Sequence, residues 1–447
     1  MIFYKHLNQL IVIVFSIFIL ILRIGKSNSN TPVFGNYDSA SYFNFSLYGG
    51  LRMPLITLFF STLRENYNIM IFQTIVSVLA FLILSLSILN LGKSNKINLF
   101  SALLVLILGN SNQIVYVDTT IDSESLQISS LALLSSAILL IFKINPSNRN
   151  YYFLFLTFFI FSGIKSMNLV LTIFLVILML IFNKFKRDFK IIIPFILIVV
   201  INSLYFFNSK VTPELNTSAI INSRLWDKVE WRQQIVDSNF PVEARSIFVR
   251  FESDNLGLPP DTAVSKLAKY QEWYSSNGKL FLPKFMLRNI DYTIVGPIFF
   301  SGFFNEVSLN KTIWRGAAVG YLNYDTYNSQ NSTFIRLSNF FWPLERSNGY
   351  LFVGIMLTII SSALLITFLK NLDLEVVKLL VIFTSFVFFS GYFAWWFGST
   401  PSDLGRQQLT FSIGLRILFI ISLNLLFSEI ISKNFFKQFL KRKLILS

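Results

Sequence analysis

The stretch that decides the fold class is YNIMIFQTIVSVLAFLILSLSILN, residues 67–90, which contains no Asp, Glu, Lys or Arg. A helix of about 20 apolar residues crosses the roughly 30 Å hydrocarbon layer of a bilayer. Similar runs recur along the 447-residue chain, of which 53% is hydrophobic and only 14% charged. Soluble proteins carry about a quarter charged residues. The sequence therefore predicts an all-α polytopic membrane protein and excludes a cytosolic enzyme.

The reactive side chains are also limited by composition. The chain has no cysteine and one histidine, His6. These counts exclude a disulfide framework, a thiolate or histidine-based zinc site and Ser-His-Asp chemistry. Acid–base chemistry must therefore rest on Asp, Glu, Lys, Arg or Tyr.

Apolar runs of spanning length predict about ten transmembrane helices. The first is expected to be an uncleaved anchor, because no small-residue cleavage site accompanies it. The predicted spans are 7–24, 67–90, 98–117, 125–142, 151–164, 167–183, 190–208, 350–369, 376–396 and 407–428.

The spans predict three parts of the chain. Residues 1–208 form a transmembrane catalytic module of about seven helices, with a catalytic outer loop over 25–66. Residues 209–345 are soluble in composition and predict an α-rich extracytoplasmic domain, inserted before the last three helices. Residues 346–447 form the C-terminal transmembrane module and a basic tail.

Orientation follows from the distribution of Lys and Arg, which are enriched in cytoplasmic segments. With the N-terminus inside, the cytoplasmic segments hold 16 basic residues against four acidic ones, and 209–345 holds 14 against 13. The net charge of +15 is therefore interpreted as a topology signal that attracts anionic membrane lipids, and nucleic acid is not an expected partner. We expect a multi-pass protein of a bacterial inner or plasma membrane with both termini in the cytoplasm.

The first candidate site is GNYDSASYF, residues 35–43, followed by GGLRMPLITLF, residues 49–59. Asp38 at the mouth of a membrane cavity could accept a proton from an acceptor group, because partial desolvation raises a carboxyl pKa. The structural alternative is that Asp38 caps a helix and Arg52 extends to lipid headgroups. The pattern alone leaves both open.

The second and third candidates are an acidic turn and a lone lysine. The turn VDTTIDSESLQ holds Asp118, Asp122 and Glu124, which could ligate a divalent cation such as Mg²⁺ or Mn²⁺. The turn could equally begin the next helix, with Glu124 interacting with its dipole. Lys165, between two predicted spans, could bind a lipid phosphate or extend to the interface.

The fourth candidate is WWFGSTPSDLGRQQL, residues 395–409, with Asp403 and Arg406 before the last span. Arginine binds phosphate oxygens with two parallel hydrogen bonds, which suits a lipid phosphate. Arg416 lies within the apolar span, so its side chain must face the bundle interior or a cavity.

The arrangement of these motifs resembles the GT-C superfamily of polyprenyl-phosphate-sugar-dependent glycosyltransferases. That superfamily includes the protein O-mannosyltransferases and the aminoarabinose transferases of lipid A, and the likeness is to an uncharacterised bacterial branch. The resemblance rests on the DSxxY setting of Asp38 and Tyr42, the R-x-P entry at Arg52, and the acidic S-E-S turn at Glu124. One departure is that Asp38 is followed by Ser39, where mannosyltransferases carry an acidic pair.

The resemblance implies that a sugar moves, with inversion, from a polyprenyl-phosphate carrier to a glycan, lipid or protein acceptor on the outer face. Asp38 would act as the base and Glu124 would support the acceptor or a metal. Other residues would support the acceptor (Tyr42, Asp122 and Asp403) or neutralise the departing phosphate (Arg52, Lys165, Arg406 and Arg416).

Three other functions compete with this interpretation. A transporter or flippase usually places ionisable residues near the bilayer midplane, whereas here, apart from Arg416, they collect at predicted outer helix ends. A surface-polysaccharide polymerase or ligase would use similar arginine chemistry on a lipid pyrophosphate. A membrane scaffold without activity is the third alternative.

Overall fold

The structure, a computed structural model, describes the greater part of the chain. The described residues are 2–27, 33–34, 43, 53–142, 146–182, 193, 196–198, 200–202, 217–218, 220–244, 268–299, 341–342, 346–369, 374–397 and 408–432. Apart from two strands of two residues each, the regular elements of this part are helical.

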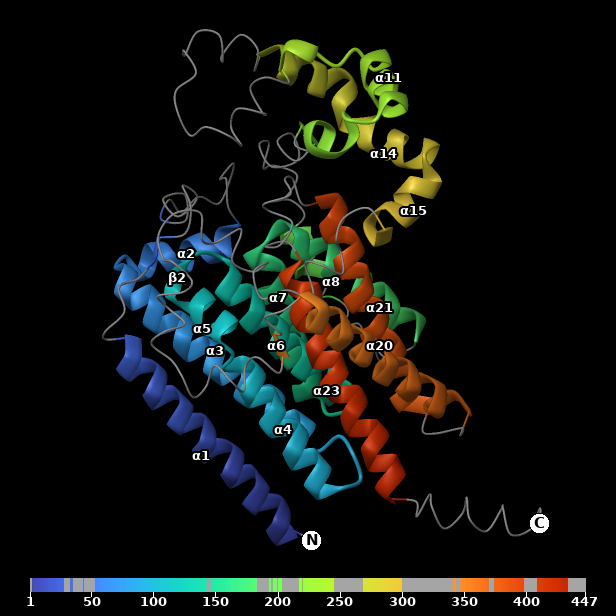
Figure 1. Cartoon of the computed structure of the whole chain (residues 1–447). Coiled ribbons are helices and arrows are strands. Elements are labelled where there is room, and N and C mark those ends of the chain that lie inside the picture. Colours follow the sequence, from blue (N-terminus) through green and yellow to red (C-terminus); the bar gives the residue numbers. More distant parts are fainter. Residues whose placement is uncertain are drawn as a thin grey trace, which may run out of the picture.

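Long apolar helices form a bundle (Figure 1). A helix lies at each predicted span except 190–208, most of which lies outside the described residues. The bundle helices are α1 (Ile2–Ser27), α3 (Asn66–Ile88), α4 (Asn95–Gly109), α6 (Glu124–Ile141), α7 (Asn148–Ile164), α8 (Ser166–Ile181), α20 (Arg346–Leu369), α21 (Leu374–Phe397) and α23 (Leu409–Ser432).

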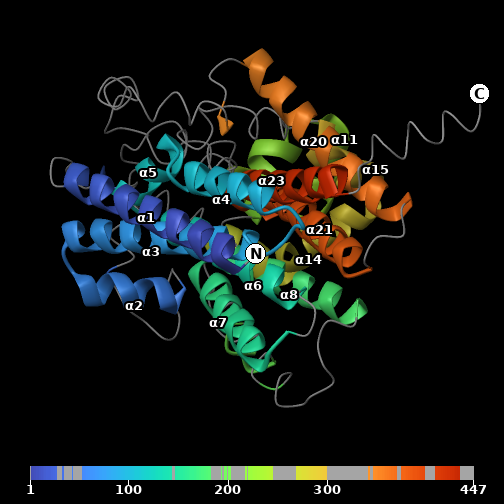
Figure 2. The same ribbon diagram turned by 90° about the horizontal axis from the view of Figure 1, so that it is seen from below.

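Two helices form the centre of the bundle. Nearly every residue of α6 is buried, and α23 is buried along most of its described length. Helix α6 packs against α3, α7 and α23, and α23 packs against α4, α20 and α21. Helix α1 lies at the periphery beside α3 and α4, as Figure 2 shows from below. Its outward Leu10, Val14 and Ile21 are exposed, as expected for a helix that faces lipid.

The described helices establish an all-α membrane protein and leave its exact number of spans as a prediction. Five described helices are long and apolar enough to cross a bilayer: α1, α3, α6, α21 and α23. Helices α4 and α5 (Asn112–Thr119) would add a sixth if they form one bent span. Helix α8 and the described apolar part of α20 are shorter than 18 residues.

The prediction of one continuous helix over 98–117 is wrong. The chain breaks at Asn110 and Ser111, and the axes of α4 and α5 differ by 46°. The sequence Gly109–Asn112 explains the break, because glycine and short polar side chains weaken a helix interior. The Trp342 indole Nε1–H also donates to Ser111 Oγ over 3.2 Å, which holds a distant segment against the break.

The predicted outer loop 25–66 contains regular structure. Helix α2 (Pro54–Leu63) begins at Pro54, and proline is favoured at a first helical position. Strand β1 (Val33–Phe34) pairs in parallel with β2 (Thr120–Ile121), so that Val33 lies opposite Thr120 and Phe34 opposite Ile121. This short ladder attaches the chain that follows α1 to the acidic turn.

The described part of 209–345 is helical and lies at one end of the bundle (Figure 1). Its elements are η2 (Ile221–Leu225), α11 (Val229–Asp237), η3 (Val242–Ala244), η4 (Tyr274–Gly278), α14 (Lys279–Arg288) and α15 (Ile290–Phe299). A cluster of buried aromatic side chains joins these elements to Trp395 and Trp396 at the end of α21.

Candidate functional site

The centre of the candidate site is the corner between α7 and α8. Lys165 occupies this corner with an extended backbone, φ −137° and ψ 141°, so neither helix includes it. Helix α6 packs beside α7, and its first residue is Glu124. The corner thereby brings a cation and a carboxylate together from two candidate motifs that are far apart in the sequence.

Lys165 and Glu124 form a largely buried ion pair. Lys165 Nζ donates to Glu124 Oε1 over 2.7 Å and to Gln127 Oε1 over 3.2 Å. The Glu124 side chain is 4% exposed and that of Lys165 is 13% exposed. Gln127 follows Glu124 by three residues and therefore lies on the same face of α6. Glu124 compensates the charge of the ammonium group, and the neutral Gln127 accepts a second hydrogen bond from it.

Gln127 extends this pair to two further helices. Its Nε2 donates to Asn168 Oδ1 over 3.2 Å and to Thr410 Oγ1 over 2.9 Å. Asn168 lies in the first turn of α8 and Thr410 in the first turn of α23. We call Glu124, Gln127, Lys165, Asn168 and Thr410 the Glu124–Lys165 network.

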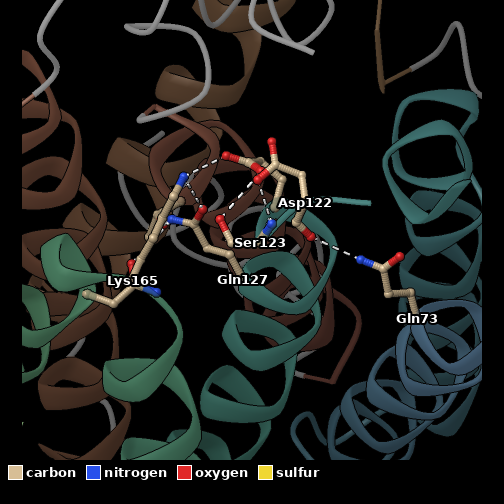
Figure 3. Close-up of polar contacts among 8 residues, drawn as sticks. Gln73, Asp122, Ser123, Gln127 and Lys165 are labelled. Atoms are coloured by element: carbon tan, nitrogen blue, oxygen red, sulfur yellow. Dashed lines mark hydrogen bonds and ion pairs between the residues drawn. The ribbon is translucent and has the colours of Figure 1, made fainter. Parts of the chain in front are cut away.

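Asp122 lies beside the network with its own local partners. Its Oδ1 accepts a 2.7 Å hydrogen bond from the Ser123 backbone N–H, and its carbonyl oxygen accepts one from Gln73 Nε2 over 3.0 Å. Figure 3 shows Gln73 on one side of the acidic turn and Lys165 with Gln127 on the other. Helix α6 begins after this turn without a side-chain capping hydrogen bond.

The third acid of the turn points to a different helix. Asp118 is fully buried and forms an ion pair with Arg23 near the end of α1, and Ser125 Oγ donates to Asp118 Oδ1 over 2.5 Å. The three acids therefore do not converge. Among the described residues, no group of three or more His, Asp or Glu side chains could hold a metal ion. A divalent cation that also uses undescribed residues stays a prediction.

Arg23 is a residue of this region that the sequence prediction missed. It lies within the predicted first span, 7–24, and is not among the candidate site residues. A charged residue near the end of an apolar span usually has a buried partner or extends to the interface. Its side chain is 6% exposed. The charge of Arg23 next to an apolar run indicates that the residue needs a partner. The spacing of residues along the sequence does not identify Asp118 as that partner.

An apolar core lies directly beside the acidic turn. Met53, Ile121, Leu126 and Ile164 belong to one buried cluster. Met53 precedes α2, Leu126 lies next to Gln127, and Ile164 precedes Lys165. The core therefore packs the start of α2 against the segments that carry Glu124 and Lys165.

Arg416 lies deeper in the bundle and is fully buried, which agrees with its predicted inward orientation. Its Nε donates to Phe341 O over 2.9 Å, and its Nη1 donates to Ser412 O and Ser412 Oγ, each over 2.8 Å. The guanidinium carbon lies 3.5 Å from the Trp342 ring centre. These contacts fix residues 341–342 against α23, and a role of Arg416 in donor binding stays a prediction.

Five predicted site residues lie outside the described residues: Asp38, Tyr42, Arg52, Asp403 and Arg406. Among the predicted site residues that the structure describes, Glu124 and Lys165 are in direct contact. Asp122 lies two residues before Glu124, in the same turn.

Comparison with known proteins gives a structural likeness but no sequence match. No protein-family model matches the sequence, and no curated protein sequence matches it. Among solved structures, the chain is similar to the archaeal oligosaccharyltransferase AglB from Archaeoglobus fulgidus, solved in complex with an inhibitory peptide and a dolichol-phosphate. The TM-score is 0.41 and the identity 10%, over 96% of this chain and 51% of AglB. The chain thus spans about half the length of that protein.

Proposed function

We propose that this protein is a membrane glycosyltransferase. It transfers a sugar from a polyprenyl-phosphate or pyrophosphate carrier to an extracytoplasmic glycan, lipid or protein. One observation carries the proposal: described segments adjoining all four candidate motifs meet at one end of the bundle, around the Glu124–Lys165 network.

Chain connectivity supports the participation of the undescribed residues. Asp38 follows Phe34 by four residues, which span at most about 14 Å, and Phe34 pairs with Ile121 in the strand ladder. Arg52 directly precedes Met53, whose side chain shares a core with Ile121. Arg406 precedes Thr410 of the network by four residues. These short lengths of chain limit how far Asp38, Arg52 and Arg406 can lie from the network, which supports including them in the proposed site.

The proposed reaction needs a base for the acceptor and cations for the departing phosphate. The Asp38 carboxylate accepts the proton of the acceptor hydroxyl, whose oxygen then forms a bond to the anomeric carbon of the sugar. The bond from that carbon to the carrier phosphate oxygen breaks, and the phosphate keeps the electron pair. Lys165 and Arg406, with Arg52, stabilise this charge, because cations in a site of low dielectric act most strongly where charge develops.

Glu124 has a positioning role in this scheme. Its carboxylate holds the Lys165 ammonium group beside α6 and compensates its charge while no carrier is bound. Tyr42, Asp122 and Asp403 are assigned to the acceptor side. In the proposed topology ten helices span a bacterial plasma membrane, both termini are cytoplasmic, and the network faces outside with the 209–345 domain.

The test uses full-length protein in lipid vesicles with radiolabelled polyprenyl-phosphate sugars and a membrane extract as the source of acceptor. The expected result is loss of label from the carrier and its appearance on an acceptor. Asp38→Asn should abolish transfer while insertion into the membrane stays normal, and the exposed Asp291→Asn is the matched control. Near-normal turnover of Asp38→Asn would remove Asp38 as the base. Movement of intact carrier across the vesicle, without cleavage, would instead identify a flippase.

A further inference from the structure

A cavity lies at the opposite end of the bundle from the Glu124–Lys165 network. Its volume is about 150 Å³, whereas a single water molecule needs about 10–15 Å³ of such space. The turn after α3, the end of α20, the start of α21 and the end of α23 form its walls. The lining residues used below are Gly92, Lys93, Ala363, Ile366 and Ser428. The cavity can therefore hold a group of several atoms.

The depth of this cavity is defined by α23, which reaches both sites. Thr410 of the network and Ser428 of the cavity are separated by about 27 Å along the helix, at 1.5 Å per residue. The hydrocarbon layer of a bilayer is about 30 Å thick. Since Ser428 also lies in the last turns of α23, which ends at Ser432, we place the cavity at the level of the headgroups of the other leaflet.

The cavity combines a buried hydroxyl group with a surface cation. Ser428 is 2% exposed, and its Oγ has no hydrogen-bond partner among the described residues. A β-carbon on Gly92 would lie closer than 3.0 Å to oxygen atoms of Ser428, Asn424 and Asn98, so only glycine leaves this hydroxyl accessible. Lys93 is exposed and lines the same cavity. A buried unsatisfied hydroxyl costs free energy, which a ligand acceptor atom would recover.

The surrounding charge favours an anion. Lys96 lies in the first turn of α4, three residues after Lys93, and residues 429–447 contain five Lys or Arg against one acid, Glu429. Glu375, adjacent to the lining residue Val376, pairs with Lys378 over 3.3 Å, which balances its charge. The other walls are mostly apolar and include Ala363 and Ile366, and the hydroxyl of the lining residue Thr367 donates to Leu364 O. Leu365, on the same helix, is exposed.

We propose that this cavity binds the phosphate headgroup of an anionic membrane lipid. The Lys93 ammonium group and the Ser428 hydroxyl donate to the phosphate oxygens, and the acyl chains lie along the apolar face of α20. The headgroup depth and the apolar walls select a lipid over free phosphate. This site is independent of the proposed sugar transfer, and its test uses no transfer assay.

The first experiment measures lipid binding to the detergent-solubilised full-length protein by native mass spectrometry. The probes are short-chain phosphatidylglycerol, short-chain phosphatidylcholine and inorganic phosphate. We expect saturable binding of phosphatidylglycerol, weakened about tenfold or more by Lys93→Gln, since a hydrogen bond to a charged group contributes about 1.5–3 kcal/mol. Lys96→Gln is the matched control and should change affinity by less than about twofold.

Three results would overturn the proposal. Equal losses for Lys93→Gln and Lys96→Gln would indicate attraction to a diffuse basic surface. Equal affinity for the two lipids would remove the anionic headgroup as the ligand. Binding of inorganic phosphate as tightly as phosphatidylglycerol would assign the cavity to the free ion.

Further variants distinguish lipid binding in the cavity from attraction to surface charge. Ser428→Ala deletes the buried hydroxyl and should weaken phosphatidylglycerol binding about tenfold. Ser422→Ala, which also removes an unpartnered buried hydroxyl from α23 but does not line the cavity, should leave binding unchanged. Ile366→Trp fills the cavity without changing charge and should abolish binding at an unaltered lipid-free Tm. Normal phosphatidylglycerol binding by Ser428→Ala would overturn the proposal. This outcome can be interpreted even if Ile366→Trp fails to fold.

Discussion

At the scale of single residues, the position of the Lys165 ammonium group matters most for the proposed chemistry. Its carbon chain leaves the corner between two helices, and its Nζ contacts Glu124 and Gln127. A cation with 13% of its side chain exposed keeps access to an incoming anion. Because Glu124 compensates its charge, Lys165 is not an isolated buried cation.

Lys165→Gln should lower sugar transfer at least about tenfold, because the variant loses a charged donor to the departing phosphate. Lys165→Arg should keep part of the activity, since it preserves the charge with altered geometry. Initial rates at varied donor concentration check both variants. Lys228→Gln in the outer helices is the control, and a normal kcat/KM for Lys165→Gln would contradict the assignment.

Arg406→Ala should weaken binding of the lipid-phosphate donor about tenfold or more, because one charged hydrogen bond to phosphate contributes about 1.5–3 kcal/mol. Donor titration of the purified protein measures this change. Arg149→Ala alters an exposed arginine at the start of α7 and serves as the comparison. Unchanged donor affinity would assign Arg406 a structural role.

At the scale of elements, two contacts attach the chain after α1 to the acidic turn. The Arg23–Asp118 ion pair joins the end of α1 to α5, and the β1–β2 ladder begins ten residues after Arg23 and two residues after Asp118. Short strands of two residues contribute little free energy alone. We therefore expect the ion pair to contribute more than the ladder to holding the end of α1 beside α5.

Asp118→Ala should destabilise the protein by about 3–5 kcal/mol, because it leaves the Arg23 charge buried without its carboxylate. The double variant Arg23→Met/Asp118→Leu should recover most of this loss, since it removes both charges. Thermal unfolding in detergent measures the change in stability. Lys378→Ala, which breaks a partly exposed pair, should cost at most about 1 kcal/mol. A loss of similar size for Lys378→Ala would contradict the prediction that burial makes the Arg23–Asp118 pair more sensitive to loss of one partner.

At the scale of the whole molecule, the outer helices are attached to the bundle through the end of α21. Arg224 of η2 donates to the Trp395 carbonyl oxygen and lies 4.2 Å from the Trp395 ring centre. Burial lowers the pKa of Arg224 to about 10. Tyr292 of α15 contacts Trp396 edge-to-face at 5.8 Å between ring centres. Residues 341–342, near the end of the predicted outer domain, pack in the bundle core, where Arg416 contacts them.

Arg224→Ala should loosen the outer helices while the bundle stays folded. We expect faster hydrogen exchange in η2, α11 and α15, and little change in α6 and α23, because the lost contacts belong to the interface alone. Arg288→Ala, on the exposed side of α14, is the matched control. Uniform acceleration across the bundle would show that Arg224 supports global stability instead.

The sequence by itself determined the membrane class, the positions of most long helices and the chemical identity of Glu124 and Lys165 as candidates. These properties follow from local composition, because the bilayer requires long apolar helices and penalises every charge within them. Only the tertiary structure decided which charges meet. Asp118 pairs with Arg23 and Glu124 with Lys165, although both acids belong to one short turn. Spacing along the chain cannot separate such partners, since each pair depends on how α1, α6 and α7 pack in three dimensions.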